Sequence, residues 1–102
     1  MREQPWTLDE ATKIVNALAS REDQSFIFTG HARDRMNERG MPENTTVLVC
    51  QQGDAVEVRL PEERQPNHRY KMRYRDGNDK LEVVVAVKDR GDGHRIIVIT
   101  VI

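Results

Sequence analysis

The chain has 102 residues, of which 37% are hydrophobic and 32% charged, so we expect a single domain (residues 1–102) with one modest core. Its 16 basic and 17 acidic residues give a net charge of −1, which excludes a uniformly basic nucleic-acid-binding protein but not a local basic patch. The single cysteine, Cys50, excludes an intramolecular disulfide and fits a reducing compartment. No apolar run reaches the ~18–20 residues of a membrane span, and the N-terminus lacks the apolar core of a signal peptide. We therefore expect a soluble cytoplasmic domain that does not contact membranes.

The N-terminal half is predicted to contain three helices and one short strand. Thr7–Glu10 has the form of a capping box, and the apolar spacing behind it predicts an N-terminal helix within residues 1–22. Phe26–Phe28 is a short run of strand formers. Two more helices are expected over His31–Arg39 and from Pro42 to Gly53, each followed by a glycine that can end it.

The C-terminal half is predicted to be a meander of four strands, over Ala55–Leu60, His68–Arg75, Leu81–Val87 and Ile96–Ile102. The first should place Val56, Val58 and Leu60 on one face. The last two lack alternation, so we expect them to be central, with these residues largely buried: Val83, Val85, Val87, Ile97, Ile99 and Val101. The predicted fold class is α+β, with helices packed on one face of a twisted antiparallel sheet of about four strands.

The helix over His31–Arg39 carries the first candidate site. His31, Arg35 and Arg39 recur every four residues, so they form one stripe within about 80° of the helix circumference, beside the core-facing Ala32 and Met36. Arginine matches phosphate oxygens in two-point contacts, and histidine exchanges protons near neutral pH, so the stripe suits a phosphodiester. The alternative is an exposed helix face whose arginines pair with nearby acidic residues.

The segment from Arg64 to Arg75 carries the second candidate site, because it has five Lys or Arg and no Asp or Glu. Arg69, Lys71 and Arg73 alternate with Tyr70 and Tyr74 in the predicted strand, a pattern typical of surfaces that bind RNA. The alternative is an edge strand whose outward cations prevent aggregation. Core packing is favoured for Tyr74, whereas Tyr70 and Lys71 fit the core and the site equally.

Other residues give weaker signals. The three histidines and Cys50 lack the spacing of a zinc site, and no glycine-rich loop opens a helix, so we expect no metal and no cofactor. Cys50 ends an apolar helical run and is expected to be buried. We expect the stripe to border a cleft against the sheet. Thr100 is a hydroxyl in an apolar strand, where it is either buried and bonded or directed into this cleft.

The stripe also carries a resemblance. Thr29-Gly30-His31-Ala32, Arg35-Met36 and Arg39-Gly40-Met41 resemble the H-A-x-x-R-M-x-x-R-G signature of a bacterial domain-of-unknown-function family. The likeness extends over residues 26–102 and leaves the N-terminal helix outside. That family is similar to the RelE, BrnT and MqsR toxins. The resemblance therefore implies a RelE-like fold, metal-independent cleavage of RNA and neutralisation by a cognate antitoxin.

The same resemblance assigns roles to residues. It implies that His31 is the acid or base and that Arg35 and Arg39 hold phosphate, while Tyr70, Lys71 and Thr100 occupy strand positions of accessory groups. The leading hypothesis is a small toxin-type endoribonuclease, with RNA and an antitoxin as partners. A non-catalytic module that binds protein or nucleic acid is the alternative, and an accessory protein that pairs through its last strand is a third possibility.

Overall fold

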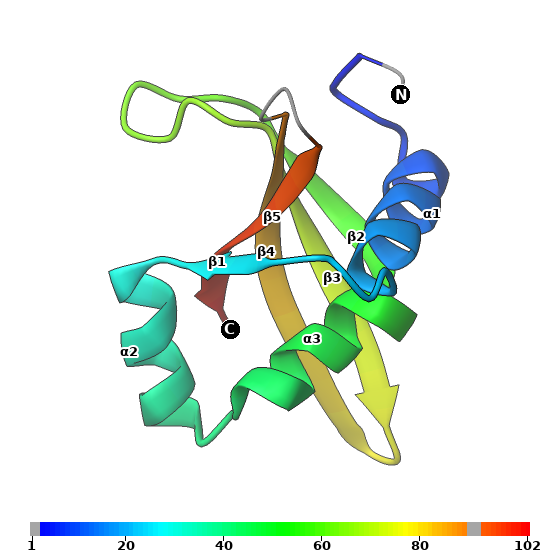
Figure 1. Ribbon diagram of the computed structural model, residues 1–102. Coiled ribbons are helices and arrows are strands. Elements are labelled where there is room, and N and C mark those ends of the chain that lie inside the picture. The colour runs from blue at the N-terminus through cyan, green and yellow to red at the C-terminus, as the bar shows by residue number, and fades with distance from the viewer. Residues whose placement is uncertain (1–2, 90–92) are drawn as a thin grey trace.

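The computed structural model describes residues 3–89 and 93–102. The sequence predicts a turn at Arg90–Gly93 between the last two strands, and most of that turn lies outside the described residues. The described chain forms three helices and five strands (Figure 1). In chain order these are α1 (Leu8–Ala19), β1 (Phe26–Phe28), α2 (Gly30–Arg39), α3 (Glu43–Gln52), β2 (Asp54–Arg59), β3 (Arg69–Asp76), β4 (Asp79–Asp89) and β5 (His94–Val101). The α+β class predicted from the sequence is confirmed.

The sheet is mixed and has five strands in the order β1-β5-β4-β3-β2, so the expected antiparallel sheet of about four strands is corrected. Strands β2 to β5 form the predicted antiparallel meander. Strand β1 adds a fifth strand parallel to β5, with Phe26 opposite Ile96 and Phe28 opposite Val98. This pairing joins segments about seventy residues apart, so no hairpin turn in the sequence predicts it.

The helices lie on one side of the sheet, and the core fills the space between them (Figure 1). Strand β4 is buried on both faces from Glu82 to Val87, as its nearly continuous apolar sequence predicts. The face that carries Val83, Val85 and Val87 meets the helices, since these three residues belong to the core cluster. Val84 and Ala86, on the other face, do not belong to it. The core residues that the helices contribute to the same cluster are Ala11, Val15, Leu18, Ala19, Ala32, Met36, Val49 and Cys50.

Two β-bulges change which side chains reach the core. In β2 the register shifts between Ala55 and Glu57, so Val56 is only half-buried, and Leu60 lies beyond the strand and is exposed. In β5 the shift opposite Val84 and Val85 leaves Ile96, Val98 and Val101 buried. Ile97 and Ile99 are half-buried, so their predicted burial is corrected. A bulge inserts one residue and thereby exchanges the faces of the residues that follow.

The caps and the N-terminal segment fix the helices. The predicted capping box is present, since the Thr7 side chain accepts from the Glu10 N–H and the Glu10 side chain accepts from Thr7. Ahead of α1, Trp6 is buried and stacks on Tyr70 with ring centroids 5.2 Å apart. Within the described residues, no helix is both long and apolar enough to cross a membrane.

Candidate functional site

Helix α2 is set by local signals at both ends. Thr29 caps it, because its Oγ1 accepts a hydrogen bond from the Ala32 N–H at 3.0 Å, and the Thr29 Oγ1–H donates to the carbonyl oxygen of Ile99 in β5 at 3.0 Å. Gly40 ends the helix with a φ of 63°, in the left-handed region that favours glycine. Ala32 and Met36 are buried, which fixes the rotation of the helix and leaves the stripe of His31, Arg35 and Arg39 at its side.

The three stripe residues have different environments. His31 and Arg39 are exposed, and their side chains have no hydrogen-bond or ion-pair partner among residues 3–89 and 93–102. The Arg35 side chain is only 29% exposed and is held in place. Its Nε donates to the carbonyl oxygen of Val101 at 3.2 Å, and its Nη1 donates to Glu38 at 3.1 Å. Arg35 is therefore a fixed cation at the end of β5, flanked by two side chains that are available to a ligand.

Arg33 lies off the stripe and has a structural role that the sequence pattern does not indicate. Its guanidinium stands over the Phe28 ring, 4.9 Å from the centroid, and forms an ion pair with Glu43 at 2.8 Å. It therefore joins β1, α2 and the start of α3. No local pattern signals these contacts, because Glu43 lies ten residues away, beyond the end of α2.

The basic strand β3 is less available than its charge suggests. Arg73 forms an ion pair with Glu82 of β4 at 2.8 Å, and Lys71 lies 3.9 Å from Glu57 of β2. The exposed fractions of the Arg73 and Lys71 side chains are 31% and 17%. Paired cations release fewer counterions when they meet phosphate, so β3 alone does not form a strong RNA-binding surface.

Arg69 is a buried residue. Only 8% of its side chain is exposed, and its Nη2 donates to the Leu60 carbonyl oxygen at 2.9 Å and to Glu62 at 3.2 Å. These bonds fasten the loop after β2 to the sheet. The Arg69 Nε is buried without a hydrogen-bond partner among the described residues. Arg69 therefore holds the loop in place and is not exposed enough to contact RNA directly.

The carboxylate of Glu57 forms ion pairs with Arg59 of its own strand and with Lys71 of β3. A hydrogen bond from Arg59 lowers the pKa of Glu57 below its ordinary value. Burial opposes this effect, and the charges of Arg59 and Lys71 lower the pKa further. Glu57 is therefore ionised at neutral pH and compensates part of the charge of β3.

Tyr70 and Thr100 do not lie together. Tyr70 is fully buried on the helix-covered face, where its hydroxyl accepts from the Trp6 N–H at 3.1 Å and donates to Gln4 at 3.0 Å. Burial raises the pKa of Tyr70, so the hydroxyl stays protonated. Thr100 is half-buried and is the register partner of Val84, on the other face of the sheet. Thr100 directly precedes Val101, whose carbonyl oxygen accepts from Arg35, so Thr100 is the sequence neighbour of the strand residue that contacts the stripe.

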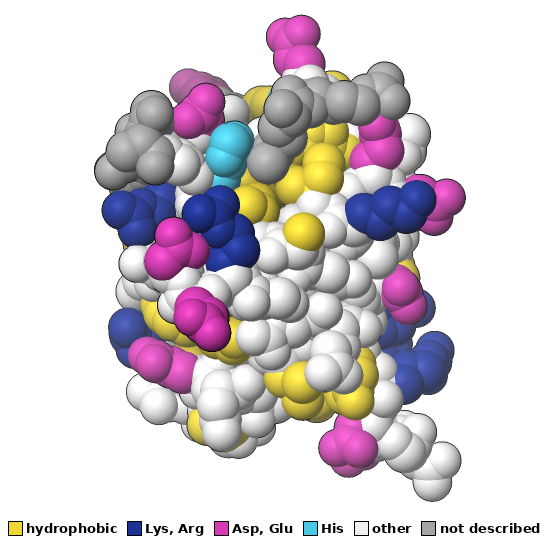
Figure 2. All heavy atoms as spheres, turned by 45° about the vertical axis from the view of Figure 1, so that its right-hand side comes forward, with side chains coloured by type: hydrophobic (Ala, Val, Ile, Leu, Met, Phe, Trp, Pro, Cys, Tyr) yellow, Lys and Arg dark blue, Asp and Glu magenta, His cyan; other side chains and the backbone are white. Residues whose placement is uncertain are grey.

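Cys50, the possible metal ligands and the surface charges limit the kinds of chemistry that this protein can perform. Burial raises the pKa of Cys50 to about 12, so its thiol is not a nucleophile at neutral pH. No group of three or more His, Cys, Asp or Glu side chains that could hold a metal ion occurs within the described part of the chain. On the face seen in Figure 2, acidic and basic side chains are interspersed and do not form one basic patch.

The clearest hollows lie away from the stripe. One is lined by residues before β1 and at the start of β5, one by Gln52, Asp54 and residues of β3, and one by residues between α2 and α3. None of these three is lined by His31, Arg35 or Arg39. The cleft predicted beside the stripe is therefore not one of these three hollows.

Comparison with known proteins identifies the family and no individual relative. No curated protein and no solved structure matches the chain. Residues 28–102, which include α2 and all strands of the meander, match the family described as Domain of unknown function (DUF4258), and α1 lies outside the match. The chain thus belongs to the DUF4258 family.

Proposed function

We propose that this protein is a small, metal-independent endoribonuclease of the RelE-like toxin type, in which the stripe on α2 is the catalytic surface. The observation that carries the proposal is the stripe itself: Arg35 is fixed against β5 while His31 and Arg39 are exposed beside it. The three stripe residues belong to the H-A-x-x-R-M-x-x-R-G signature, and this signature lies within the segment that matches the family. Neutralisation by a cognate antitoxin belongs to the same proposal and is supported by the resemblance.

The reaction that these side chains suit is attack of a ribose 2′-hydroxyl on the adjacent phosphate. In this proposal His31 takes the proton of the 2′-hydroxyl, and the departing 5′-oxygen takes a proton from solvent. Arg35 and Arg39 stabilise the negative charge that develops on the phosphate oxygens. The anchored Arg35 loses little freedom on binding, because Val101 and Glu38 already hold its guanidinium.

The strand residues have secondary roles in this proposal. Lys71 and Arg73 remain partly exposed, so they can contact an RNA strand that extends from the stripe past Thr100. Arg69 holds the loop after β2 and Tyr70 holds Trp6, so we assign neither to contact with substrate.

The test is cleavage of a mixed RNA by the purified protein in the presence of a chelator. We expect products that end in a 2′,3′-cyclic phosphate, and His31→Ala should slow their formation ~10²–10⁴-fold. Arg39→Lys should also slow cleavage, since an ammonium cannot reproduce the two-point contact. Asn37→Ala, an exposed change on α2 outside the stripe, is the control and should leave the rate unchanged. Metal-dependent cleavage, or none, would refute the proposal.

A second candidate function is a non-catalytic module that binds RNA or protein through the same surface. Two observations favour it. The Lys71 and Arg73 charges are already paired with Glu57 and Glu82, and the described residues provide no partner that orients the His31 ring as a general base usually requires. Binding of RNA without cleavage, with equal affinity for the wild-type protein and His31→Ala, would support this alternative.

A further inference from the structure

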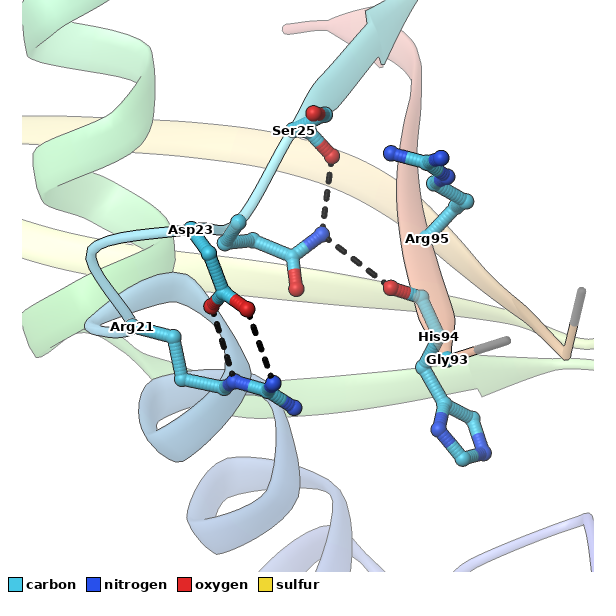
Figure 3. Close-up of a pocket in the computed structure, with 7 residues that line it drawn as sticks. Arg21, Asp23, Ser25, Gly93, His94 and Arg95 are labelled. Atoms are coloured by element: carbon cyan, nitrogen blue, oxygen red, sulfur yellow. Dashed lines mark hydrogen bonds and ion pairs between the residues drawn. The ribbon is translucent and has the colours of Figure 1, made fainter.

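A polar cavity at the other end of β1 and β5 is not part of the proposed catalytic surface. Its volume is about 200 Å³, the volume of roughly seven water molecules, so it can hold a phosphate group with several waters. Figure 3 shows the residues that line it, which come from the segment before β1 and from the start of β5. They are Arg21, Asp23, Gln24, Ser25, Gly93, His94 and Arg95.

The walls of this cavity are fixed by the sheet. Strands β1 and β5 run parallel with Phe26 opposite Ile96, so Ser25 and Arg95 come to the same end of the pair. The Gln24 side chain then joins the two segments, because its Nε2 donates to the Ser25 carbonyl oxygen at 2.8 Å and to the His94 carbonyl oxygen at 3.3 Å. These bonds connect the two segments that line the cavity.

The charge of the cavity favours an anion. Arg21 donates from Nε and Nη2 to the two oxygens of Asp23, each at 3.2 Å, which orients its guanidinium and leaves Nη1 available. The Arg95 side chain has no hydrogen bond or ion pair within the described ranges, so all five of its N–H donors are available. Two guanidinium groups against one carboxylate give a net charge of +1 before His94 is counted.

The arrangement of the cations favours an extended ligand. In Figure 3 the side chain of Arg95 extends toward the Ser25 side, whereas the Arg21 guanidinium and the His94 ring lie at the opposite side of the cavity. Cations on two sides of the cavity can each contact a different phosphate of one extended strand.

We propose that this cavity binds the phosphodiester backbone of single-stranded nucleic acid, with Arg95 contacting one phosphate and Arg21 with His94 contacting another. The choice of nucleic acid rests on the proposed function. The cavity lies roughly 13 Å from the start of α2, the length of the strand positions from Ser25 to Thr29, so one bound strand could reach both the cavity and His31.

The test uses the imidazole NMR signals of the full chain, which has three histidines. The probe is an oligodeoxythymidylate of about eight nucleotides, which the proposed reaction cannot cleave because it has no 2′-hydroxyl. We expect the His94 signals to shift with the oligonucleotide at concentrations where equimolar inorganic phosphate leaves them unchanged. An equal response to inorganic phosphate would overturn the assignment to a backbone and identify a site for the free ion.

The variant is Arg95→Gln, which keeps most of the side chain's stem, and the matched control is Lys88→Gln. Lys88 is the register partner of Arg95, is exposed and does not line the cavity. We expect Arg95→Gln to weaken oligonucleotide binding at least about fivefold and to reduce the His94 shift at the same oligonucleotide concentration, with less than a twofold effect of Lys88→Gln. Equal effects of both variants would show non-specific attraction and would overturn the proposal. If Arg95→Gln does not fold, Arg21→Gln serves the same comparison.

The two proposals can fail separately in these experiments. A His94 shift in a protein that never cleaves RNA would refute the catalytic function and leave the cavity as a binding site. Cleavage that depends on His31, with oligonucleotide binding unaffected by Arg95→Gln and Arg21→Gln, would refute the cavity and leave the catalytic function.

Discussion

Replacing Tyr70 with phenylalanine separates a structural role of this residue from a catalytic one. The Tyr70 hydroxyl accepts a hydrogen bond from the Trp6 N–H at 3.1 Å and donates one to Gln4 at 3.0 Å. The two aromatic rings stack at an angle of 15°. Tyr70→Phe keeps this stack and the packing of the ring, so only the polar link to the N-terminal segment is lost.

The size of the effect follows from burial. Removing an acceptor of the buried Trp6 N–H costs about 1–3 kcal/mol, because folding no longer repays the desolvation of that group. For a domain of this size each kcal/mol lowers the Tm by about 4–8 °C, so we expect the Tm of Tyr70→Phe to fall by at least about 4 °C. Cleavage of RNA per folded molecule should be unchanged, since Tyr70 is inaccessible to substrate.

The measurement is thermal unfolding followed by circular dichroism, combined with the RNA cleavage assay. Tyr74→Phe is the matched control, because Tyr74 is half-buried in the same strand and its hydroxyl has no hydrogen-bond partner within the described chain. Equal Tm values for the two variants would refute the structural role. Loss of cleavage by Tyr70→Phe at an unchanged Tm would place Tyr70 in the chemistry.

Three more predictions concern the sheet and its charges. Val85→Asp should abolish the cooperative melt, because an unpaired carboxylate at this fully buried site costs ~3 kcal/mol or more out of about 5–15, and a retained melt would contradict the placement of β4. Because the hydrogen bond from Arg59 lowers the pKa of Glu57 in the folded state, its carboxylate stabilises the fold above about pH 4.5, and this contribution is lost as the pH falls through the lowered value. Urea midpoints of the wild type and Glu57→Gln should therefore differ at neutral pH and converge in acid, whereas a constant difference would contradict this linkage. If RNA binds the stripe, Arg39→Gln should reduce the slope of log affinity against log salt by about one, and Arg69→Gln should leave it unchanged because Arg69 is buried in an ion pair. Equal reductions would show that Arg69 reaches RNA.

The parts of the fold that were predicted correctly depend on neighbours in sequence. Helix α2 is an example: its cap at Thr29, its core positions at Ala32 and Met36, and its left-handed end at Gly40 are all visible within a dozen residues. The antiparallel meander follows in the same way from short turns between apolar runs, as at Gly77, which has a φ of 63°.

The parts that could not be predicted depend on contacts between distant segments. The parallel pairing of β1 with β5 requires the chain to pass through two helices and three strands first. The bulges at Val56 and in β5 insert one residue without a glycine or proline to mark it, and each moves the following side chains to the other face. The cavity beside β1 could not be predicted for the same reason, because Arg21 and Arg95, which both line it, are about seventy positions apart in the sequence.

The surface charge of β3 shows how distance in sequence misleads an argument about function. The twelve residues from Arg64 to Arg75 include five Lys or Arg and no acidic residue, which suggests a basic surface. Strand register then places Glu57 opposite Lys71 and Glu82 opposite Arg73, and both acidic residues come from other strands. Each pair reduces the positive potential that attracts phosphate. The cations that keep their full charge for a ligand are instead those without such a cross-strand partner, and Arg39 on the stripe and Arg95 in the cavity meet that condition among the residues described. A search for nucleic-acid contacts in this protein should therefore begin with these two arginines, one at the end of α2 and one at the start of β5.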